Sequence, residues 1–373
     1  MGDVELPVTI DDLVTLAAAH AGSTDASGRF PRGVIDAFLS GGLGALLSST
    51  DHGGQGGTLR EASAVVERLA QACGSTAMIV AMHYCGAVVV EALGDAPSRR
   101  AVAEGRALTT LAFSEAGSRS HFWAPVSTAR RDSGQVVLDA RKSWITSANH
   151  AHLFVWSSQG TAGEGASLWL VPGATPGIAT GTAFDGMGLR GNDSAPAVAD
   201  GVRIPLANLL GEDGQGGEVM LGTVLPVFSV LNASAALGMA RAAIAGTIAH
   251  ATATRFQHLD QSISNYPTAR AHIARMQLKA DLVAALLDQT LTALEQPGEN
   301  TMLRVLEIKA AAGEAATEIT DLAMRVCGGA AFRKEVGVER QFRDARANTV
   351  MAPTTDQLFD FIGRALCGID LFA

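Results

Sequence analysis

The sequence predicts an α+β protein with an N-terminal α-helical domain, a middle β-barrel or sandwich domain and a C-terminal four-helix bundle. Apolar residues recur at helical steps at the start of the chain, short apolar runs between turn residues fill the middle, and long helical periods return at the end. The 373 residues are 47% hydrophobic and 17% charged, which is typical of a globular protein with a large core. We expect the domain boundaries 1–106, 107–216 and 217–373.

The first domain is predicted to be helical because Val65, Val66 and Leu69 follow a three- and four-residue spacing. Its longest apolar stretch, 77–90, contains His83 and has about 14 residues, fewer than the ~20 that a membrane-spanning helix needs. We therefore expect this stretch to be a buried helix and expect no membrane partner.

The middle domain is predicted to be a sheet because short β-like runs at 126–129, 136–139 and 168–171 are separated by turn residues such as Gly, Pro and Asp. Helical spacing returns in long blocks after residue 217. The apolar positions of these blocks are Ile273, Met276, Leu282, Val283, Leu286, Leu287, Leu303, Leu306, Ile308 and Ala312. A helical bundle is therefore expected to close the chain.

Charge and cysteine content exclude several classes of protein. The chain has 28 Lys and Arg against 37 Asp and Glu, a net charge of -9, which disfavours a protein that neutralises nucleic-acid phosphates. Its four cysteines form no CxxC motif, so neither a zinc site nor a disulfide framework is predicted. The acidic start of the chain does not resemble a signal peptide. We expect a cytoplasmic location, small-molecule or protein partners and no nucleic-acid partner.

Three local motifs give weaker signals. Segment 186–191 matches GxGxxG, but a β-like run follows it instead of the helix that a dinucleotide-binding loop requires. His150 and His152 have no third ligand nearby, so no metal site is expected. The Ser and His residues of 118–121 lack a GxSxG motif, so a hydrolase triad is weakly supported.

A set of longer motifs is more specific. The middle of the chain contains FSEAGSRS at 113–120, KSWITS at 142–147, GMGLRGNDS at 186–194 and IPLANLLG at 204–211. The C-terminal half contains Arg255, Cys327-Gly328-Gly329 and Arg343-Asp344-Ala345. In this order and spacing the motifs resemble the acyl-CoA dehydrogenase flavoprotein family over most of the chain, most weakly before residue 50.

The resemblance implies an oxidoreductase that binds FAD noncovalently and stabilises the reduced flavin with hydrogen-bond donors. By family position, Ser114 and Thr146 would donate to the ring, Trp144 would pack beside it and Ser120 would lie near the pyrophosphate. The complete set of implied cofactor-binding residues is Phe113, Ser114, Ser120, Trp144, Thr146, Arg255, Gly328, Gly329, Thr354 and Asp356. An ordinary core position is the alternative for Trp144.

Family positions also imply a site that is shared between subunits. Arg255, Gly328 and Gly329 would approach the FAD of a neighbouring subunit, which implies a homodimer or homotetramer. A solvated charge at a helix end is the alternative role for Arg255.

The position of the general base departs from the family. Typical members have a Glu-Gly-Thr sequence before the last helix, and the residue that matches its glutamate is Ala352. A second family location of the base matches Phe228 or Ser229, so that carboxylate is absent too. Loss of a general base typically costs ~10²- to 10⁴-fold in rate, which puts simple acyl-CoA β-oxidation in doubt.

Three residues are candidates for a replacement base. Asp356 lies one helical turn after Ala352, but we favour a capping and dipole role for it, with Pro353 at the first helical position. His83 and His121 are candidates for the removal of a hydroxyl proton because histidine titrates in the useful range. A satisfied core position is the favoured alternative for His83.

The predicted function is oxidation of an acyl thioester, on CoA or acyl carrier protein, by hydride transfer to flavin N5. A β-hydroxyacyl substrate, as in polyketide extender-unit biosynthesis, would need no base at the α-carbon, because its proton leaves from oxygen. Electron-transfer flavoprotein or O2 is the expected electron acceptor. Two alternatives stay open: a flavin-dependent monooxygenase of the same fold, and a non-catalytic subunit of a hetero-oligomeric acyl-CoA dehydrogenase.

Overall fold

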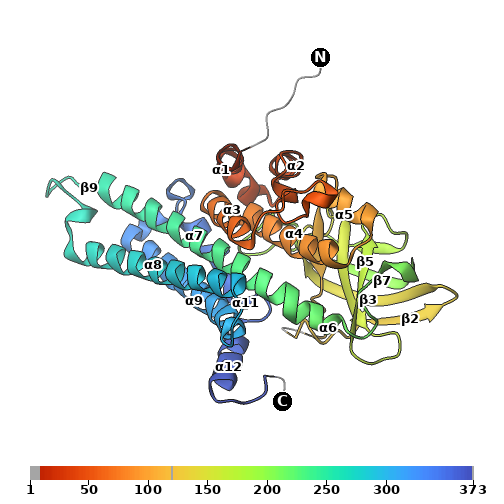
Figure 1. The fold of residues 1–373 in the computed structure, drawn as a ribbon. Coiled ribbons are helices and arrows are strands. Elements are labelled where there is room, and N and C mark those ends of the chain that lie inside the picture. Colours follow the sequence, from red (N-terminus) through yellow and green to blue (C-terminus); the bar gives the residue numbers. More distant parts are fainter. Residues whose placement is uncertain (1–8, 119–120, 372–373) are drawn as a thin grey trace. The chain divides into compact units, whose positions relative to one another are not determined.

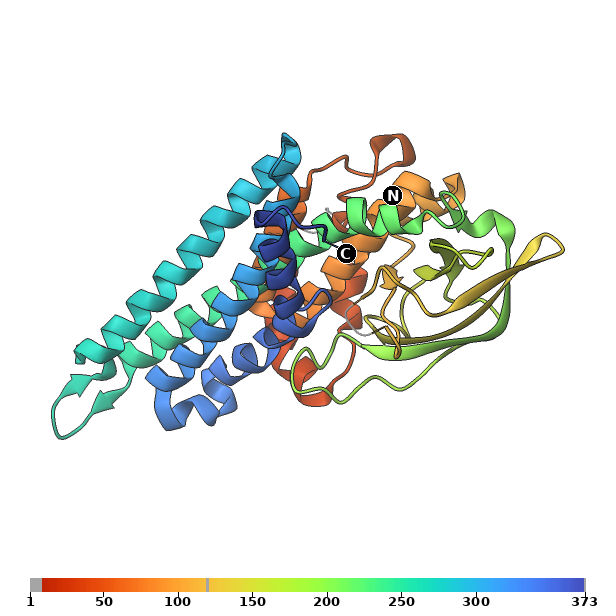
Figure 2. The ribbon, with the colours of Figure 1, turned by 90° about the horizontal axis from the view of Figure 1, so that it is seen from below.

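The computed structural model describes residues 9–118 and 121–371 (Figures 1 and 2). Two compact units are present, and each is described by itself. Within the described residues, the first unit contains 9–65, 78–185 and 190–228, and the second contains 66–77, 186–189 and 229–371. Along the chain the predicted order of helices, strands and helices is confirmed.

The α-helices of the first unit are α1 (Ile10–Ser27), α2 (Arg32–Ser40), α5 (Ala96–Ala103), α6 (Gly216–Val219), the starts of α3 (Leu59–Ala72) and α7 (Leu225–Ala253), and most of α4 (Gly74–Leu93). A capping box begins α1. Thr9 Oγ1 accepts a hydrogen bond from Asp12 N at 3.2 Å, and the Asp12 carboxylate accepts one from Thr9 N at 3.1 Å. Gly28 ends the helix with a φ of 65°, a left-handed conformation that glycine adopts without strain. Local sequence therefore determines both ends of α1.

Helix α4 is longer than the apolar stretch at 77–90 from which it was predicted. The helix has 20 residues, so its length and composition are sufficient for a membrane span. The same holds for the continuous helical segment Gly216–Ala253, which has 38 residues. In the structure, 72% of the apolar window of α4 and 67% of that of the second segment are buried inside the protein. Burial, and not insufficient length, is what indicates a core helix.

The middle of the chain forms two four-stranded sheets. One has the order β1-β4-β5-β8, formed by Thr109–Ala112, Leu153–Gln159, Ala166–Pro172 and Leu209–Leu210. The other has the order β2-β3-β7-β6, formed by Thr128–Asp132, Gln135–Ile145, Ala195–Pro205 and Ile178–Thr180. In these sheets β1 and β4 pair in parallel, and the other pairs are antiparallel.

The two sheets share one apolar core. Trp156 of β4 and Trp169 of β5 are fully buried in the same cluster as Val136 of β3 and Ile204 of β7. Alternate residues of each strand point to the same face, so each sheet contributes one apolar face to this cluster. The predicted β-sandwich is thereby confirmed.

The helices of the second unit are α8 (Pro267–Glu295), α9 (Thr301–Cys327), α10 (Val338–Ala345), α11 (Ala347–Val350), α12 (Thr355–Leu366) and the part of α7 (Leu225–Ala253) that follows residue 228. Helix α9 packs against α8, α10, α11 and α12, and it lies side by side with α8 in both ribbon views (Figures 1 and 2). A short hairpin of β9 (Arg255–Phe256) and β10 (Gln261–Ser262) separates α7 from α8. The predicted C-terminal helical bundle is confirmed.

The GxGxxG segment has a packing role in the second unit. A Cβ atom on Gly188 would lie 2.4 Å from the Arg343 carbonyl oxygen, so only glycine allows this close approach to α10. Leu189 N donates to the Asp344 carboxylate at 2.6 Å, and Arg343 Nη1 donates to the Met187 carbonyl at 2.9 Å. The segment continues into β7 and not into a helix, so it is not a dinucleotide-binding loop.

Candidate functional site

The motif segments 113–118 and 142–147 lie beside each other in the first unit. Ser143 N donates to the Ser114 carbonyl at 3.0 Å, and Glu115 forms an antiparallel bridge with Lys142. The strand register of β3 shifts between Lys142 and Ile145, and Trp144 has a φ of 58°. The two motifs that carry the family resemblance are therefore neighbours in space.

Trp144 is exposed and not part of the core. Its relative exposure is 61%, and its ring lies against Phe184 with the ring centres 4.2 Å apart. The positive φ turns this residue away from the regular alternation of β3, so the side chain leaves the core face. The alternative that Trp144 is an ordinary core aromatic is wrong.

The other proposed flavin-contact residues of this unit differ in exposure. Ser114 is half-buried, Thr146 is buried, and the Thr146 carbonyl accepts from Thr110 Oγ1 at 2.8 Å. Phe113 is buried with its ring parallel to that of Phe122 at 6.3 Å. Ser120 lies outside the described residues.

Two serine hydroxyls of the same region lack an internal partner. Ser118 Oγ and Ser147 Oγ are buried and have no hydrogen-bond partner among the residues that the structure describes. Buried hydroxyls are normally satisfied, so each of these is a candidate contact for a bound molecule. They follow Ser114 and Trp144 by four and three positions in the sequence.

A buried ion pair, which the residue pattern did not predict, joins these two motifs. Lys142 Nζ lies 2.5 Å from a Glu115 oxygen, and the two side chains are 0% and 1% exposed. Lys142 Nζ also donates to Ser157 O at 2.7 Å and to Ser157 Oγ at 2.9 Å. Glu115 accepts from the Ser127 hydroxyl and from the backbone N–H groups of Val126 at 2.6 Å and Ser127 at 3.1 Å. Both charges are therefore fully hydrogen-bonded, as buried charges must be.

The lowered pKa of Glu115 predicts that the protein is less stable at acid pH. Burial alone would raise the pKa of Glu115, but the Lys142 ammonium and the Ser127 and Val126 hydrogen bonds lower it below its ordinary 4.5. The Glu115 carboxylate therefore contributes its full stabilisation of the fold when the pH is above its pKa in the unfolded chain. This contribution is lost as the pH falls through the lower pKa of Glu115 in the folded protein. We expect the free energy of unfolding to fall below pH 4.5 with a slope that Glu115→Gln/Lys142→Met reduces. Urea titrations at a series of pH values measure this, and identical slopes would contradict the prediction.

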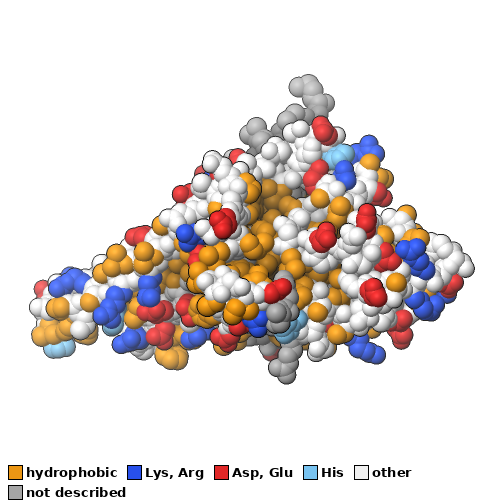
Figure 3. Space-filling model, turned by 60° about the horizontal axis from the view of Figure 1, so that its bottom comes forward, with side chains coloured by type: hydrophobic (Ala, Val, Ile, Leu, Met, Phe, Trp, Pro, Cys, Tyr) orange, Lys and Arg blue, Asp and Glu red, His pale blue; other side chains and the backbone are white. Residues whose placement is uncertain are grey.

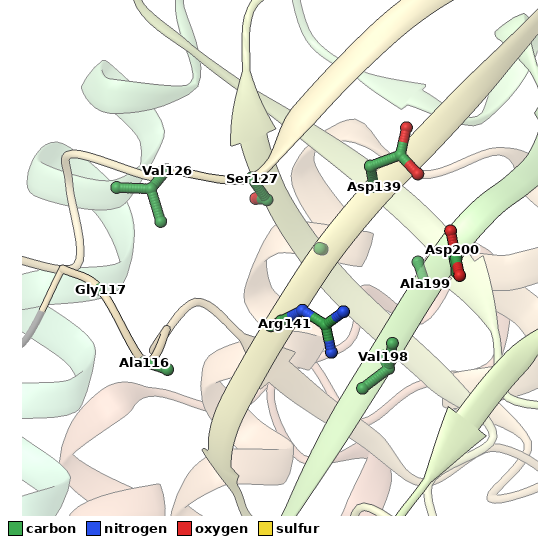
Figure 4. A pocket seen from close by; sticks show the side chains of 10 residues that line it. Ala116, Gly117, Val126, Ser127, Asp139, Arg141, Val198, Ala199 and Asp200 are labelled. Carbon is green, nitrogen blue, oxygen red and sulfur yellow. The ribbon is translucent and has the colours of Figure 1, made fainter.

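A pocket of about 370 Å³ lies next to the 113–118 segment (Figure 4). Figure 4 shows Ala116 and Gly117 on one side of it and residues of β3 and β7 on the other. Its charged lining residues are Arg141, Asp139 and Asp200. With more negative than positive charge, this lining does not favour a phosphate group.

His83 has the geometry of a structural histidine. It is fully buried in α4, its Nε2 lies 2.9 Å from the Gly44 carbonyl, and its Nδ1 accepts from Thr109 N at 3.1 Å. Burial lowers the pKa of His83 to about 4, so the ring is neutral near pH 7. Since both ring nitrogens are occupied by the backbone, the geometry favours the core position over a role as hydroxyl base.

His121 remains the accessible histidine candidate. Its side chain is exposed. The centres of the His121 and Trp123 rings lie 5.2 Å apart, and the ring planes are 79° apart. Its backbone N–H donates to the Ser118 carbonyl at 3.0 Å. The role of His121 as a base stays a prediction.

The segment around Ala352 belongs to the second unit. Ala352 is half-buried, and Thr354 caps α12 because its Oγ1 accepts from Gln357 N at 3.3 Å. The helix begins at Thr355, so the expectation that Pro353 is the first helical residue is wrong. Asp356 is exposed in the first turn, where its charge interacts favourably with the helix dipole. At the other family location, Ser229 is fully buried and Phe228 half-buried.

The residues expected at a neighbouring subunit's cofactor lie on the surface of the second unit. Arg255 follows α7 in β9, and its guanidinium lies 2.7 Å from the exposed Asp260 carboxylate. Gly328 and Gly329 follow α9, and a Cβ on either would meet no atom within 4 Å. Their role at an intersubunit site stays a prediction.

Three family models match the chain in sequence order. The N-terminal domain of acyl-CoA dehydrogenase matches residues 12–104, the middle domain matches 110–202, and the C-terminal domain matches 214–367. The helical, sheet and helical regions of the chain match these three domain models in order. The chain belongs to the acyl-CoA dehydrogenase family, and FAD is its cofactor.

Two curated acyl-CoA dehydrogenases are similar in sequence to most of the chain. The chain is 28% identical over 348 residues to the probable acyl-CoA dehydrogenase YngJ of Bacillus subtilis, covering 91% of this chain and 90% of that protein. It is 29% identical over 349 residues to the short-chain specific acyl-CoA dehydrogenase of Bos taurus, covering 90% and 82%.

Two solved structures share the fold over nearly the whole chain. Butyryl-CoA dehydrogenase from Megasphaera elsdenii has a TM-score of 0.88 at 22% identity, covering 98% of this chain and 100% of that one. FkbI, described for biosynthesis of the methoxymalonyl extender unit of the polyketide Fk520, has a TM-score of 0.87 at 22% identity, covering 97% and 99%.

The residues of the first unit fit a flavin. An exposed indole offers a face for a planar ring, and the unpartnered hydroxyls of Ser118 and Ser147 offer hydrogen bonds to a polar group. These features meet the requirements of an aromatic cofactor with many hydrogen-bond acceptors.

Proposed function

We propose that this oxidoreductase acts on an acyl thioester of CoA or acyl carrier protein and prefers a β-hydroxyacyl group to a saturated acyl chain. The observation that carries the proposal is Ala352, a methyl group at the family position of the catalytic glutamate. Oxidation of a CH–CH bond requires a base at the α-carbon, whereas oxidation of a CH–OH group releases its proton from oxygen. FkbI, which has the same fold and is described for biosynthesis of the methoxymalonyl extender unit, supports a role in polyketide extender-unit supply.

The chain's own residues would bind and orient the reactants. Ser114 and Thr146 would donate to the flavin ring and Trp144 would pack against it. Family position also gives Thr354 a contact with FAD. When bound, FAD supplies the two-electron acceptor for the hydride that leaves the substrate carbon. His121, exposed beside the 113–118 segment, is the proposed acceptor of the hydroxyl proton.

Anaerobic flavin reduction tests the substrate class. The FAD-loaded protein is mixed with matched saturated and β-hydroxyacyl thioesters, each on CoA and on acyl carrier protein, and bleaching of the flavin is followed. We expect faster bleaching with the β-hydroxyacyl form. Faster bleaching with the saturated form would refute the preference, and a product that gains oxygen after external reduction would support the monooxygenase alternative. Failure to bind FAD would support the non-catalytic subunit.

The Asp356→Asn variant tests whether Asp356 is the general base or a residue that interacts with the dipole of α12. We expect the flavin-reduction rate to stay within about twofold, because removal of a true general base costs ~10²- to 10⁴-fold. A slightly lower thermal midpoint is expected from the lost charge at the α12 N-terminus. Stopped-flow reduction and thermal unfolding measure the two effects, and a rate loss of a hundredfold would assign the base to Asp356.

Assembly into a homodimer or homotetramer is proposed from the surface of the second unit. Leu278 and Leu282 of α8 are 63% and 71% exposed, and Phe332 is 82% exposed. Figure 3 shows hydrophobic side chains at the surface among charged ones. Leu278 and Leu282 are four residues apart and so lie on the same face of α8, and exposed apolar side chains on one helix face are typical of an interaction surface. Light scattering of the FAD-loaded protein would measure the assembly, and reoxidation with electron-transfer flavoprotein or O2 would identify the acceptor.

A further inference from the structure

Lys309 is a buried lysine beneath the segment that replaces the family's Glu-Gly-Thr. It lies in α9 and is 0% exposed. Its ammonium donates to the Pro353 carbonyl at 2.7 Å, to the Met351 carbonyl at 3.0 Å and to the Asn348 carbonyl at 3.4 Å. All of these residues belong to the second unit. One side chain therefore contacts one carbonyl group of α11 and two carbonyl groups of the segment between α11 and α12.

These contacts act on the backbone at both sides of position 352. Met351 and Pro353 are its two chain neighbours, and each carbonyl is held by the same nitrogen atom. The Met351 carbonyl belongs to the peptide group that precedes residue 352, and the Pro353 carbonyl belongs to the peptide group that precedes Thr354. Lys309 therefore restricts the backbone before and after position 352. Thr354, the N-cap of α12, follows immediately.

Lysine suits this position chemically. An ammonium group has three donors and no acceptor, which matches three carbonyl oxygens around one point, whereas the guanidinium of arginine is planar and larger. Burial lowers the pKa of Lys309 to about 7. Burying a lysine is costly unless its N–H groups are hydrogen-bonded, and the three carbonyl contacts meet this requirement.

We propose that Lys309 is a positioning residue, which holds the 348–353 backbone in one conformation and so fixes Thr354 and the side chain at 352 for their contacts with FAD and substrate. This inference rests on the proposed function for the contact between Thr354 and FAD. Lys309 acts through the segment and does not itself touch FAD or substrate.

The test compares Lys309→Met with Lys279→Met. Methionine keeps the length and apolar character of the Lys309 stem but removes all three donors. Lys279 lies in α8 of the same unit and forms a surface ion pair with Glu318 at 2.6 Å, so it is a matched lysine without such contacts. Backbone amide hydrogen exchange, FAD titration and steady-state kinetics are measured for both variants and for the wild type.

For Lys309→Met we expect amide exchange of 348–357 to accelerate about tenfold or more, with exchange of α8 and the middle sheet unchanged. FAD is expected to bind about tenfold more weakly and kcat to fall more than KM rises, because the reacting geometry is disturbed more than substrate binding. Lys279→Met should match the wild type in every measurement. Uniform acceleration across the bundle, or unchanged exchange at 348–357, would overturn the proposal.

A double-mutant cycle tests the route through Thr354. If Lys309 acts through this residue, Lys309→Met should weaken FAD binding much less in a Thr354→Val background than in the wild type. Equal losses in both backgrounds would refute that route.

Two further measurements cover the case of a misfolded variant. Lys309→Gln, which retains an amide donor, replaces Lys309→Met if the latter does not fold. In the wild-type protein, addition of FAD should slow exchange of the 348–357 amides. No slowing would refute the contact of this segment with FAD and with it the proposed role of Lys309. The exchange and FAD measurements need no substrate, so an error in the proposed substrate class would not affect them.

Discussion

Ala352→Glu is expected to raise the rate of saturated acyl-CoA dehydrogenation by about 10²- to 10⁴-fold, the contribution of one well-placed general base. The substitution restores a carboxylate where typical family members have one. The Ala352 side chain is half-buried, so part of its surface is open to solvent. Lys309 holds the flanking carbonyls, so the new side chain starts from an ordered backbone.

Ala352→Gln is the matched control, because glutamine has the shape of glutamate without its basicity. Anaerobic flavin bleaching by a saturated acyl-CoA is measured for both variants and for the wild type. Equal rates for the two variants would show that shape, not base catalysis, is responsible. A wild-type rate as high as that of Ala352→Glu would mean that another group already serves as the base, and would contradict the proposed substrate preference.

Lys142→Met is expected to reduce the free energy of unfolding by about 3–5 kcal/mol, because it leaves the buried Glu115 carboxylate without its cation. The loss of FAD binding should be large as well, since Ser114 precedes Glu115 and Trp144 follows Lys142 by two residues. Urea denaturation and FAD titration measure the two effects.

The double variant Glu115→Leu/Lys142→Met is the control for the Lys142 prediction. An apolar pair of similar volume removes both charges, so it should recover most of the stability that the single variant loses. If the double variant is as unstable as the single one, packing and not an unpaired charge explains the loss.

The order of helical, sheet and helical regions followed from local patterns, since hydrophobic spacing depends only on neighbouring residues. The limits of individual elements did not. The apolar stretch at 77–90 belongs to a 20-residue helix, because the less apolar residues at its ends also adopt the helical conformation. The strand expected at 126–129 begins at Thr128, where pairing with β3 begins. Pairing depends on a partner that is distant in sequence, so local spacing does not locate it.

The site residues also differ in whether local sequence predicts them or only the folded structure reveals them. The motifs around Ser114 and Trp144 were recognisable in the sequence, but the exposure of Trp144 depends on a register shift and a positive φ in β3. Glu115, Lys142 and Lys309 were missed because charged residues are normally placed at the surface. One signal was present: Lys309 lies between Leu306 and Ala312 on the apolar spacing of its helix.

By itself the sequence determined the fold class, the family, the flavin motifs and the absence of the usual glutamate, because each of these depends only on residue identity and spacing. Only the tertiary structure decided that His83 is enclosed by backbone groups, that Trp144 is exposed and that Lys142 and Lys309 are buried cations with fixed partners. The physical reason is that burial and hydrogen bonding depend on segments that are far apart in the chain and meet only when it folds.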